Sequence, residues 1–202
     1  MKNGVKVIFL DIDGVLNGWN KPTQIFGDIC MKNKYLKKLW IKWDIFGIRT
    51  IKVLILSIIC HLSGAKVVLS SSWRGGFLKP YKENSSRMKS LKRKFKIFGI
   101  KVIGITPRDR DGIRGLEIEE WLKTTDLDVK GFVIIDDETH DIEEFFSDNI
   151  IKTTTASYQD IVNGNFENTN SGLSFKDIKK ALKILKIPND KSYMTVDKNL
   201  VF

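Results

Sequence analysis

Cysteine and histidine are scarce in this chain of 202 residues, which holds two of each. Cys30 and Cys60 are far apart in sequence, in no spacing typical of a zinc site, and they cannot supply a disulfide framework. His61 and His140 stand in unrelated contexts, so the sequence supports neither a zinc centre nor a histidine-based catalytic triad. We therefore expect a reducing, cytoplasmic environment.

Long apolar runs are also missing. The most apolar stretch is Ile45–Leu62, but Arg49 and Lys52 interrupt it and leave only Val53–Cys60 free of charge. A membrane-spanning helix needs roughly 20 apolar residues. We expect no transmembrane segment and interpret this stretch as a buried or partner-facing helix. The first apolar run of the chain is too short for a signal peptide.

Acidic residues are outnumbered, since 34 lysines and arginines against 24 aspartates and glutamates give a net charge of +10. This excess favours a polyanionic partner, such as nucleic acid, a nucleotide or an anionic membrane surface. A G-x-x-x-x-G-K-[ST] segment is absent, which excludes a P-loop kinase. The length and the 42% of hydrophobic residues indicate one globular domain over 1–187, followed by a tail over 188–202.

Short apolar segments alternate with helical patterns along the chain. Amphipathic helices are expected from Met88 to Phe98 and from Leu116 to Leu122, and Ser174 with Asp177 predicts a capping box that opens a third helix. This alternation predicts an α/β fold with a central parallel sheet flanked by helices. The five expected strands are Val5–Asp11, Ala65–Ser71, Lys101–Thr106, Gly131–Asp137 and Asn149–Thr154.

The segment 17–64 is longer than a simple crossover between the first two strands. We predict a small helical insertion there, placed as a cap over the strand ends. A peripheral insertion without a catalytic part is an equal alternative.

Three expected strands end in polar side chains, namely Asp11, Ser70–Ser71 and Asp136–Asp137. The carboxyl ends of parallel strands meet at one sheet edge, where ligands bind. Asp13 follows Asp11 so closely that the two charges are costly unless a metal ion or a chemical task compensates them. An EF-hand loop is excluded because Val15 occupies a ligand position. We expect Asp11 to be a nucleophile and Asp13 a general acid and base.

These segments resemble the motifs of the haloacid dehalogenase (HAD) superfamily. DIDGVLN (Asp11–Asn17) looks like motif I, VVLSSSWR (Val67–Arg74) like motif II and VIIDD (Val133–Asp137) like motif IV. The stretches SSSWR, RGLEIEEWL and SGLS are similar to small HAD domains associated with RNA repair proteins. The resemblance covers about Val5 to Thr154 and implies a Rossmann-like HAD fold.

The resemblance also implies a Mg²⁺-dependent phosphomonoesterase with an aspartyl-phosphate intermediate. Asp11 and Asp136 would supply carboxylate oxygens to the metal, Asp13 its backbone carbonyl, and Asp137 a direct or water-mediated contact. Asp11 would attack phosphorus, and Asp13 would protonate the leaving oxygen and then activate water.

The sequence offers several candidates for the phosphate-binding residues. Ser71 is favoured over Ser70 because it lies two residues before Trp73, as in related motifs. Arg114 is favoured as the basic residue of motif III, because it precedes the helix that leads into VIIDD. Asp141 is a secondary acidic candidate, and His140 is expected on the surface. The other basic candidates are Lys92, Lys94, Arg108 and Arg110.

The expected helix near Arg87–Lys96 is rich in lysine and arginine and follows motif II, so it could contact nucleic acid. Trp73 or Phe77 could stack on a base. The alternative is that these charges only solvate the outer face of a helix. We therefore expect phosphate removal from nucleotide or polynucleotide ends. The alternatives are a small-metabolite phosphatase, or a catalytically silent module that binds nucleic acid or a membrane surface.

Overall fold

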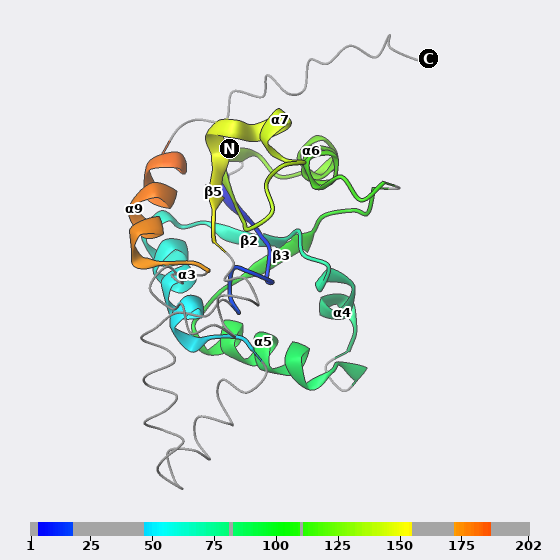
Figure 1. The fold of residues 1–202 in the computed structure, drawn as a ribbon, viewed down its shortest axis with the longest axis vertical. Coiled ribbons are helices and arrows are strands. Elements are labelled where there is room, and N and C mark those ends of the chain that lie inside the picture. Colours follow the sequence, from blue (N-terminus) through cyan, green and yellow to red (C-terminus); the bar gives the residue numbers. More distant parts are fainter. Residues whose placement is uncertain (1–3, 18–46, 81–82, 110, 155–171, 187–202) are drawn as a thin grey trace, which may run out of the picture.

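Five short strands form one parallel sheet in the computed structural model, which describes residues 4–17, 47–80, 83–109, 111–154 and 172–186. The sheet order is β3-β2-β1-β4-β5, and every neighbouring pair is parallel. This confirms the predicted α/β class and Rossmann-like arrangement (Figure 1). The strands are β1 (Val5–Leu10), β2 (Lys66–Leu69), β3 (Val102–Ile105), β4 (Val129–Asp136) and β5 (Ile150–Lys152).

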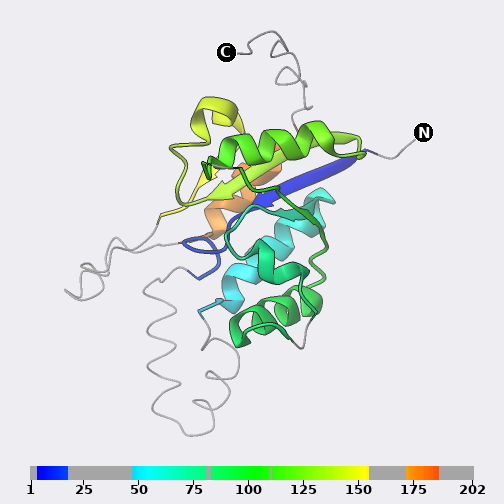
Figure 2. The ribbon, with the colours of Figure 1, turned by 90° about the vertical axis from the view of Figure 1, so that its right-hand side faces the viewer.

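Helices cover both faces of this sheet, which explains why the last four residues of its central strand, Val7–Leu10, are all apolar. On β1, Ile8 and Leu10 belong to one apolar cluster, whereas Val7 and Phe9 belong to a second. All four are fully buried, because successive side chains of a strand point to opposite faces. Figure 2 shows α6 on one side of the sheet and α3 on the other.

The first cluster lies under α3 (Thr50–Ser63), α5 (Ser86–Ile97) and α9 (Phe175–Ile184). The second lies under α6 (Arg114–Thr124) and α7 (Glu143–Phe146), and a short helical turn, η2 (Ser147–Asn149), leads into β5. The last long helix opens with the predicted capping box, in which the Ser174 backbone N–H donates to Asp177 Oδ2 over 2.8 Å. The two predicted amphipathic helices are present as α5 and α6.

The structure describes only part of the predicted insertion over 17–64. Its last residues form α3, a crossover helix between β1 and β2 that buries Val53, Leu56 and Ile59 in the core. The apolar stretch is therefore a buried helix, and this part of 17–64 does not belong to a cap. Residues 18–46 lie outside the described residues, as does the tail, so a cap there stays a prediction.

The carboxyl edge of the sheet collects the polar ends of three neighbouring strands, β2, β1 and β4. The chain leaves β1 toward β2 on one side, and β4 is added on the other, so β1 lies at a switch point of the topology. In the described part of the chain, no helix combines the length and the apolar character needed to cross a membrane.

Candidate active site at the carboxyl edge of the sheet

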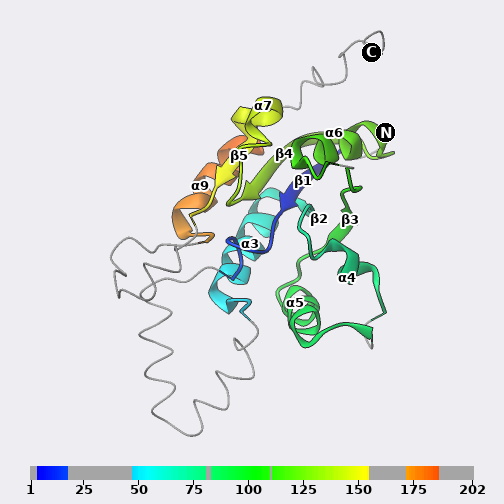
Figure 3. The same cartoon turned by 45° about the vertical axis from the view of Figure 1, so that its right-hand side comes forward.

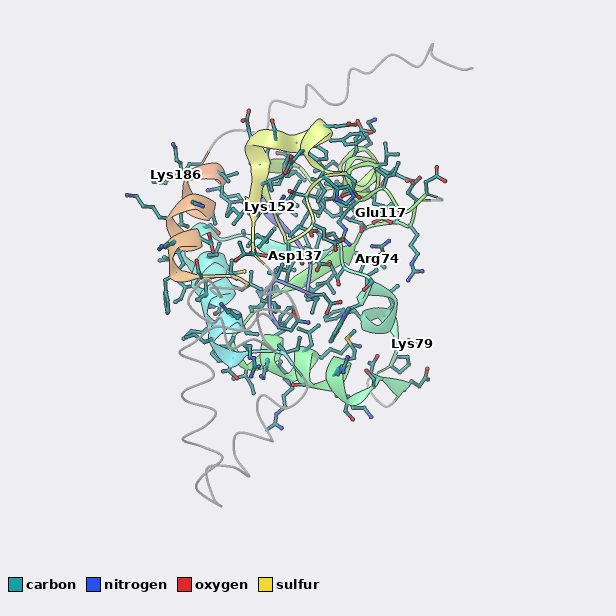
Figure 4. The ribbon with its side chains drawn as sticks, in the orientation of Figure 1. Arg74, Lys79, Glu117, Asp137, Lys152 and Lys186 are labelled. Carbon is teal, nitrogen blue, oxygen red and sulfur yellow. The ribbon has the colours of Figure 1, made fainter. Side chains whose placement is uncertain are left out.

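Three carboxylates meet at the ends of β1 and β4. Asp11 follows β1 and donates its backbone N–H to Ile135 of β4 over 3.0 Å, which places it beside Asp136 at the end of that strand. Oxygens of Asp11, Asp136 and Asp137 lie within 4.8 Å of one another. Asp11 is 4% exposed and Asp136 is fully buried. Parallel pairing of β1 with β4 therefore produces the predicted acidic cluster (Figure 4, where Asp137 is labelled).

Burial makes these charges costly. Burial and, next, the neighbouring charge of Asp136 together raise the pKa of Asp11 to about 7, against the opposing effects of Arg114 and the Ser71 hydroxyl. Burial likewise raises the pKa of Asp136, and with the opposing effect of Arg114 included this pKa is about 6. Carboxylates so close together, with a raised proton affinity, form a donor set that suits a hard divalent cation. The residues present therefore fit the Mg²⁺ that the HAD motifs imply.

Arg114 joins two of the carboxylates. Its Nη1 donates to Asp11 Oδ1 over 2.9 Å and to Asp136 Oδ2 over 2.5 Å. Burial acts to lower the pKa of the guanidinium, but the two carboxylate charges outweigh it and raise that pKa. The structure thus brings the favoured basic residue directly to the cluster.

The first turn of α6 holds Arg114 in this place. The Arg114 backbone N–H donates to Asp141 Oδ2 over 2.8 Å, so this acidic side chain binds the start of the helix. At Gly115, an added Cβ would lie 2.5 Å from the Asp141 carbonyl oxygen, which leaves room only for glycine. The secondary acidic candidate, Asp141, is therefore a positioning residue for Arg114.

The two serines at the end of β2 differ in their contacts. The Ser71 hydroxyl lies close enough to the Asp11 carboxylate to act to lower its pKa, and it accepts the Trp73 backbone N–H over 3.3 Å. The Ser70 hydroxyl is buried and has no hydrogen-bond partner among the residues that the structure describes. Of the two serines, Ser71 is the one that the structure brings to Asp11.

Asp13 lies apart from the acidic cluster with an exposed side chain. Its Oδ1 accepts the Asn17 side-chain amide over 2.7 Å, and its Oδ2 accepts the Trp73 indole N–H over 2.8 Å. Both carboxylate oxygens are thus oriented by neighbours. Sequence patterns predicted no role for Asn17 and only a stacking role for Trp73. The contact with Trp73 joins residues 60 positions apart, which no local pattern indicates.

Gly14 is required where the chain turns between these groups. Its φ is +66°, and an added Cβ would lie 2.1 Å from Cγ of Asp137. Its carbonyl accepts the Thr153 hydroxyl over 3.0 Å. Glycine therefore permits both the left-handed backbone and the close approach of Asp137.

A buried ion pair behind the site was not expected from the sequence. Arg74 and Glu117 are 6% and 3% exposed, and Arg74 Nη2 donates to Glu117 Oε1 over 2.5 Å. Arg74 Nη1 also donates to the Ser70 carbonyl over 2.9 Å, and Glu117 Oε1 accepts the Asp109 backbone N–H over 3.2 Å. The pair ties the loop after β2 to the helix that carries Arg114 (Figure 4). Arg74 begins the short helix α4 (Arg74–Leu78).

Two of the remaining basic candidates make contacts away from the acidic cluster. Lys94 is 2% exposed and donates to the Ile48 carbonyl, so it is withdrawn from the expected basic surface. Lys92 Nζ donates to the Lys79 carbonyl over 2.8 Å and lies 5.1 Å from the centre of the Phe77 ring. Arg108 is exposed, and Arg110 lies outside the described residues. His140 is exposed, as expected.

Comparison with known proteins agrees with this geometry. A family model described as the HAD domain in Swiss Army Knife RNA repair proteins matches residues 7–158. A search of curated proteins found no match. The matched stretch runs from β1 through β5 and includes the acidic cluster, Ser71 and Arg114. Since it spans most of the 202 residues, the chain belongs to this family of HAD domains.

Proposed function

We propose that this HAD domain is a Mg²⁺-dependent phosphomonoesterase that removes the terminal phosphate from nucleotides or polynucleotides. The observation that carries the proposal is the position of Asp11. Its buried carboxylate lies among Asp136 and Asp137, with the Ser71 hydroxyl and the Arg114 guanidinium in contact with it. A nucleophile, counter-charge for a phosphoryl group and donors to its oxygens are thus gathered at one point.

In the first step, Asp11 attacks phosphorus while the bond from phosphorus to the leaving oxygen breaks. Asp13 donates a proton to that oxygen, so the alcohol departs neutral and an aspartyl-phosphate remains. Asp13 then takes a proton from water, the water oxygen bonds to phosphorus, and the bond from phosphorus to Asp11 breaks. Free Asp11 and inorganic phosphate result.

Other side chains hold the phosphoryl group and the charge around it. The Ser71 hydroxyl and the remaining N–H donors of Arg114 would bind phosphoryl oxygens, since both bonds to the carboxylates come from Nη1 and leave the donors of Nη2 and Nε for a substrate. Asp11, Asp136 and Asp137, with the backbone carbonyl of Asp13, would hold Mg²⁺. The ion supplies positive charge that lets an anionic carboxylate meet an anionic phosphate.

The nucleotide part of the proposal is supported by charge. The net charge is +10, and α5 carries exposed basic side chains directly after motif II. An RNA-repair context for the matching family points in the same direction. A basic surface beside a phosphate site attracts a substrate with further phosphates.

Phosphate release tests the proposed function. The substrates are an aryl phosphate, nucleoside monophosphates, and oligonucleotides with a 3′- or a 5′-phosphate, each assayed with Mg²⁺ and with EDTA. We expect release that depends on Mg²⁺ and is fastest with nucleotide or oligonucleotide substrates. Faster turnover of small metabolite phosphates contradicts the nucleotide assignment. No release from any substrate by folded protein contradicts the enzyme assignment and favours a binding module.

Mg²⁺ is expected to raise the thermal unfolding temperature more at about pH 8 than at about pH 5.5. The pKa values of Asp11 and Asp136, about 7 and about 6, lie above the ordinary 3.8. In the metal-free protein, the stabilisation from these protonated groups is therefore full below the ordinary carboxyl pKa and is lost as pH rises through about 6 to 7. Mg²⁺ binds the deprotonated carboxylates, so it restores most stability at the higher pH.

Thermal unfolding followed by circular dichroism, with Mg²⁺ and with EDTA, measures this difference. Asp136→Asn serves as the matched variant, because it removes one of the clustered carboxylates and should abolish most of the Mg²⁺ effect. Equal Mg²⁺ effects at both pH values would contradict metal binding by these groups.

A further inference from the structure

A pocket of about 470 Å³ lies between α4 and α5. Its walls come from the residues after β2 and from the first turn of α5, which Figures 1 and 3 show side by side with α4. Trp73 forms part of the wall, and the indole N–H of the same side chain donates to Asp13. The pocket therefore begins at the side chain that orients the general acid of the proposed reaction.

The leaving group of the proposed reaction must lie next to Asp13. In the proposed reaction Asp13 donates a proton to the leaving oxygen, so the remainder of the substrate extends from Asp13 away from the acidic cluster. The pocket shares Trp73 with Asp13, whereas Asp11, Asp136 and Asp137 are absent from its walls. The pocket thus suits the part of the substrate that carries the phosphate.

The walls combine apolar and cationic groups. The partly exposed indole of Trp73 and the buried side chain of Met88 supply apolar surface. Lys79 and Arg87 supply two positive charges, against the single acidic side chain of Glu83. Stacking on an aromatic ring suits a nucleobase, and the cations suit a phosphate.

The start of α5 adds to the attraction for an anion. Ser85 caps this helix of 12 residues, and its first turn holds no acidic side chain. The N–H groups and the dipole of a helix N-terminus favour negative charge. Arg87, in the same turn, lies on the pocket wall. A phosphate next to Arg87 would therefore meet both a guanidinium and a helix N-terminus.

Asn84 provides an independent indication of a ligand. It is 7% exposed and lines the pocket, and its amide nitrogen donates to the carbonyls of Lys79 and Pro80. Its Oδ1 is buried without a hydrogen-bond partner. A buried acceptor without a donor is costly, so a shift of the Asn84 amide that turns Oδ1 toward an N–H or O–H of a base or sugar in the pocket would be favourable.

We propose that this pocket binds the nucleoside that carries the scissile phosphate, with the second phosphate of that nucleoside against Arg87 and the start of α5. The proposal rests on the proposed function and adds its substrate class. The preferred substrate is then a nucleoside with phosphates on both sides, as found at a phosphorylated polynucleotide end, rather than a nucleoside monophosphate.

Adenosine 3′,5′-bisphosphate tests the pocket in two ways. In steady-state kinetics, we expect wild-type kcat/KM for the bisphosphate to exceed that for either adenosine monophosphate by about tenfold. Arg87→Gln should remove most of this preference, which is read as the ratio of the two kcat/KM values. Lys186→Gln makes the same change of charge beside α9, on the other side of the molecule from Lys79 (Figure 4), and should keep the preference.

Calorimetry separates this proposal from the proposed function. In protein that carries Asp11→Asn, to prevent turnover, Arg87→Gln should weaken binding of the bisphosphate about tenfold in the presence of Mg²⁺. Unchanged binding, or an unchanged kcat/KM ratio, would overturn the pocket assignment even if the enzyme hydrolyses phosphates. Weakened binding without any turnover by the wild type would uphold the pocket and refute the phosphatase.

Discussion

Asp11→Asn is expected to reduce phosphate release by about 10³-fold or more, because an amide cannot replace a carboxylate nucleophile. The substitution preserves the size of the side chain, so Ser71 and Arg114 keep a polar group to contact. The variant should also unfold no more easily than the wild type in EDTA at about pH 8. Burial holds the pKa of Asp11 at about 7, so the charged carboxylate destabilises the metal-free fold at this pH and a neutral amide does not.

The measurement is phosphate release from the best substrate, combined with thermal unfolding of the same preparations. Asp126→Asn is the matched control, since this exposed side chain undergoes the same chemical change outside the site. It should keep full activity. Residual activity of Asp11→Asn close to that of Asp126→Asn would show that another group attacks phosphorus.

Glu117→Gln is expected to lower the free energy of unfolding by about 3 kcal/mol, because it leaves the positive charge of Arg74 buried without its partner. The effect should extend to activity. Arg74 also holds the Ser70 carbonyl, and Glu117 belongs to the helix that carries Arg114, so the ion pair fixes two sides of the candidate site relative to each other. We therefore expect a lower kcat as well as a lower stability.

Urea denaturation measures the change in stability, and two further variants identify its cause. Glu120→Gln removes an exposed acidic group from the same helix and should change the free energy of unfolding by less than about 0.5 kcal/mol. The double variant Arg74→Met with Glu117→Leu removes both charges and should recover most of the stability. It should not recover kcat, since the Ser70 carbonyl loses its donor. A loss below about 1 kcal/mol for Glu117→Gln would contradict this account.

The strands and the acidic residues at their ends were predictable from local patterns. Short apolar segments with helices between them predict parallel strands, and parallel strands align their carboxyl ends. Asp11 and Asp136 are therefore placed at one edge of the sheet before any side-chain contact is known. The order of the HAD-like motifs carried the family assignment, which the match over residues 7–158 confirms.

Side-chain direction at the strand ends depended on the tertiary structure. Adjacent serines have the same chemistry in the sequence, but only Ser71 contacts Asp11, because neighbouring residues at the end of β2 point in different directions. The sequence favoured Arg114 among the basic candidates, but its contact with the acidic cluster depends on the tertiary structure. Arg114 reaches the cluster because Asp141 fixes the first turn of α6, whereas Lys94 turns to the Ile48 carbonyl.

Contacts between segments far apart in the chain could not be predicted from the sequence and depend on the fold. The periodicity of apolar residues depends only on neighbours within a few helical turns or along one strand. It was therefore sufficient to indicate the strands, the helices and the acidic edge of the sheet. The bonds of Asp13 with Trp73 and of Arg74 with Glu117 join residues 60 and 43 positions apart. Their formation depends on how β2, α4 and α6 pack together, and the position of α3 in the core depends on the same packing. Local sequence patterns thus indicate which residues belong to the site, whereas the distances between those residues depend on the folded chain.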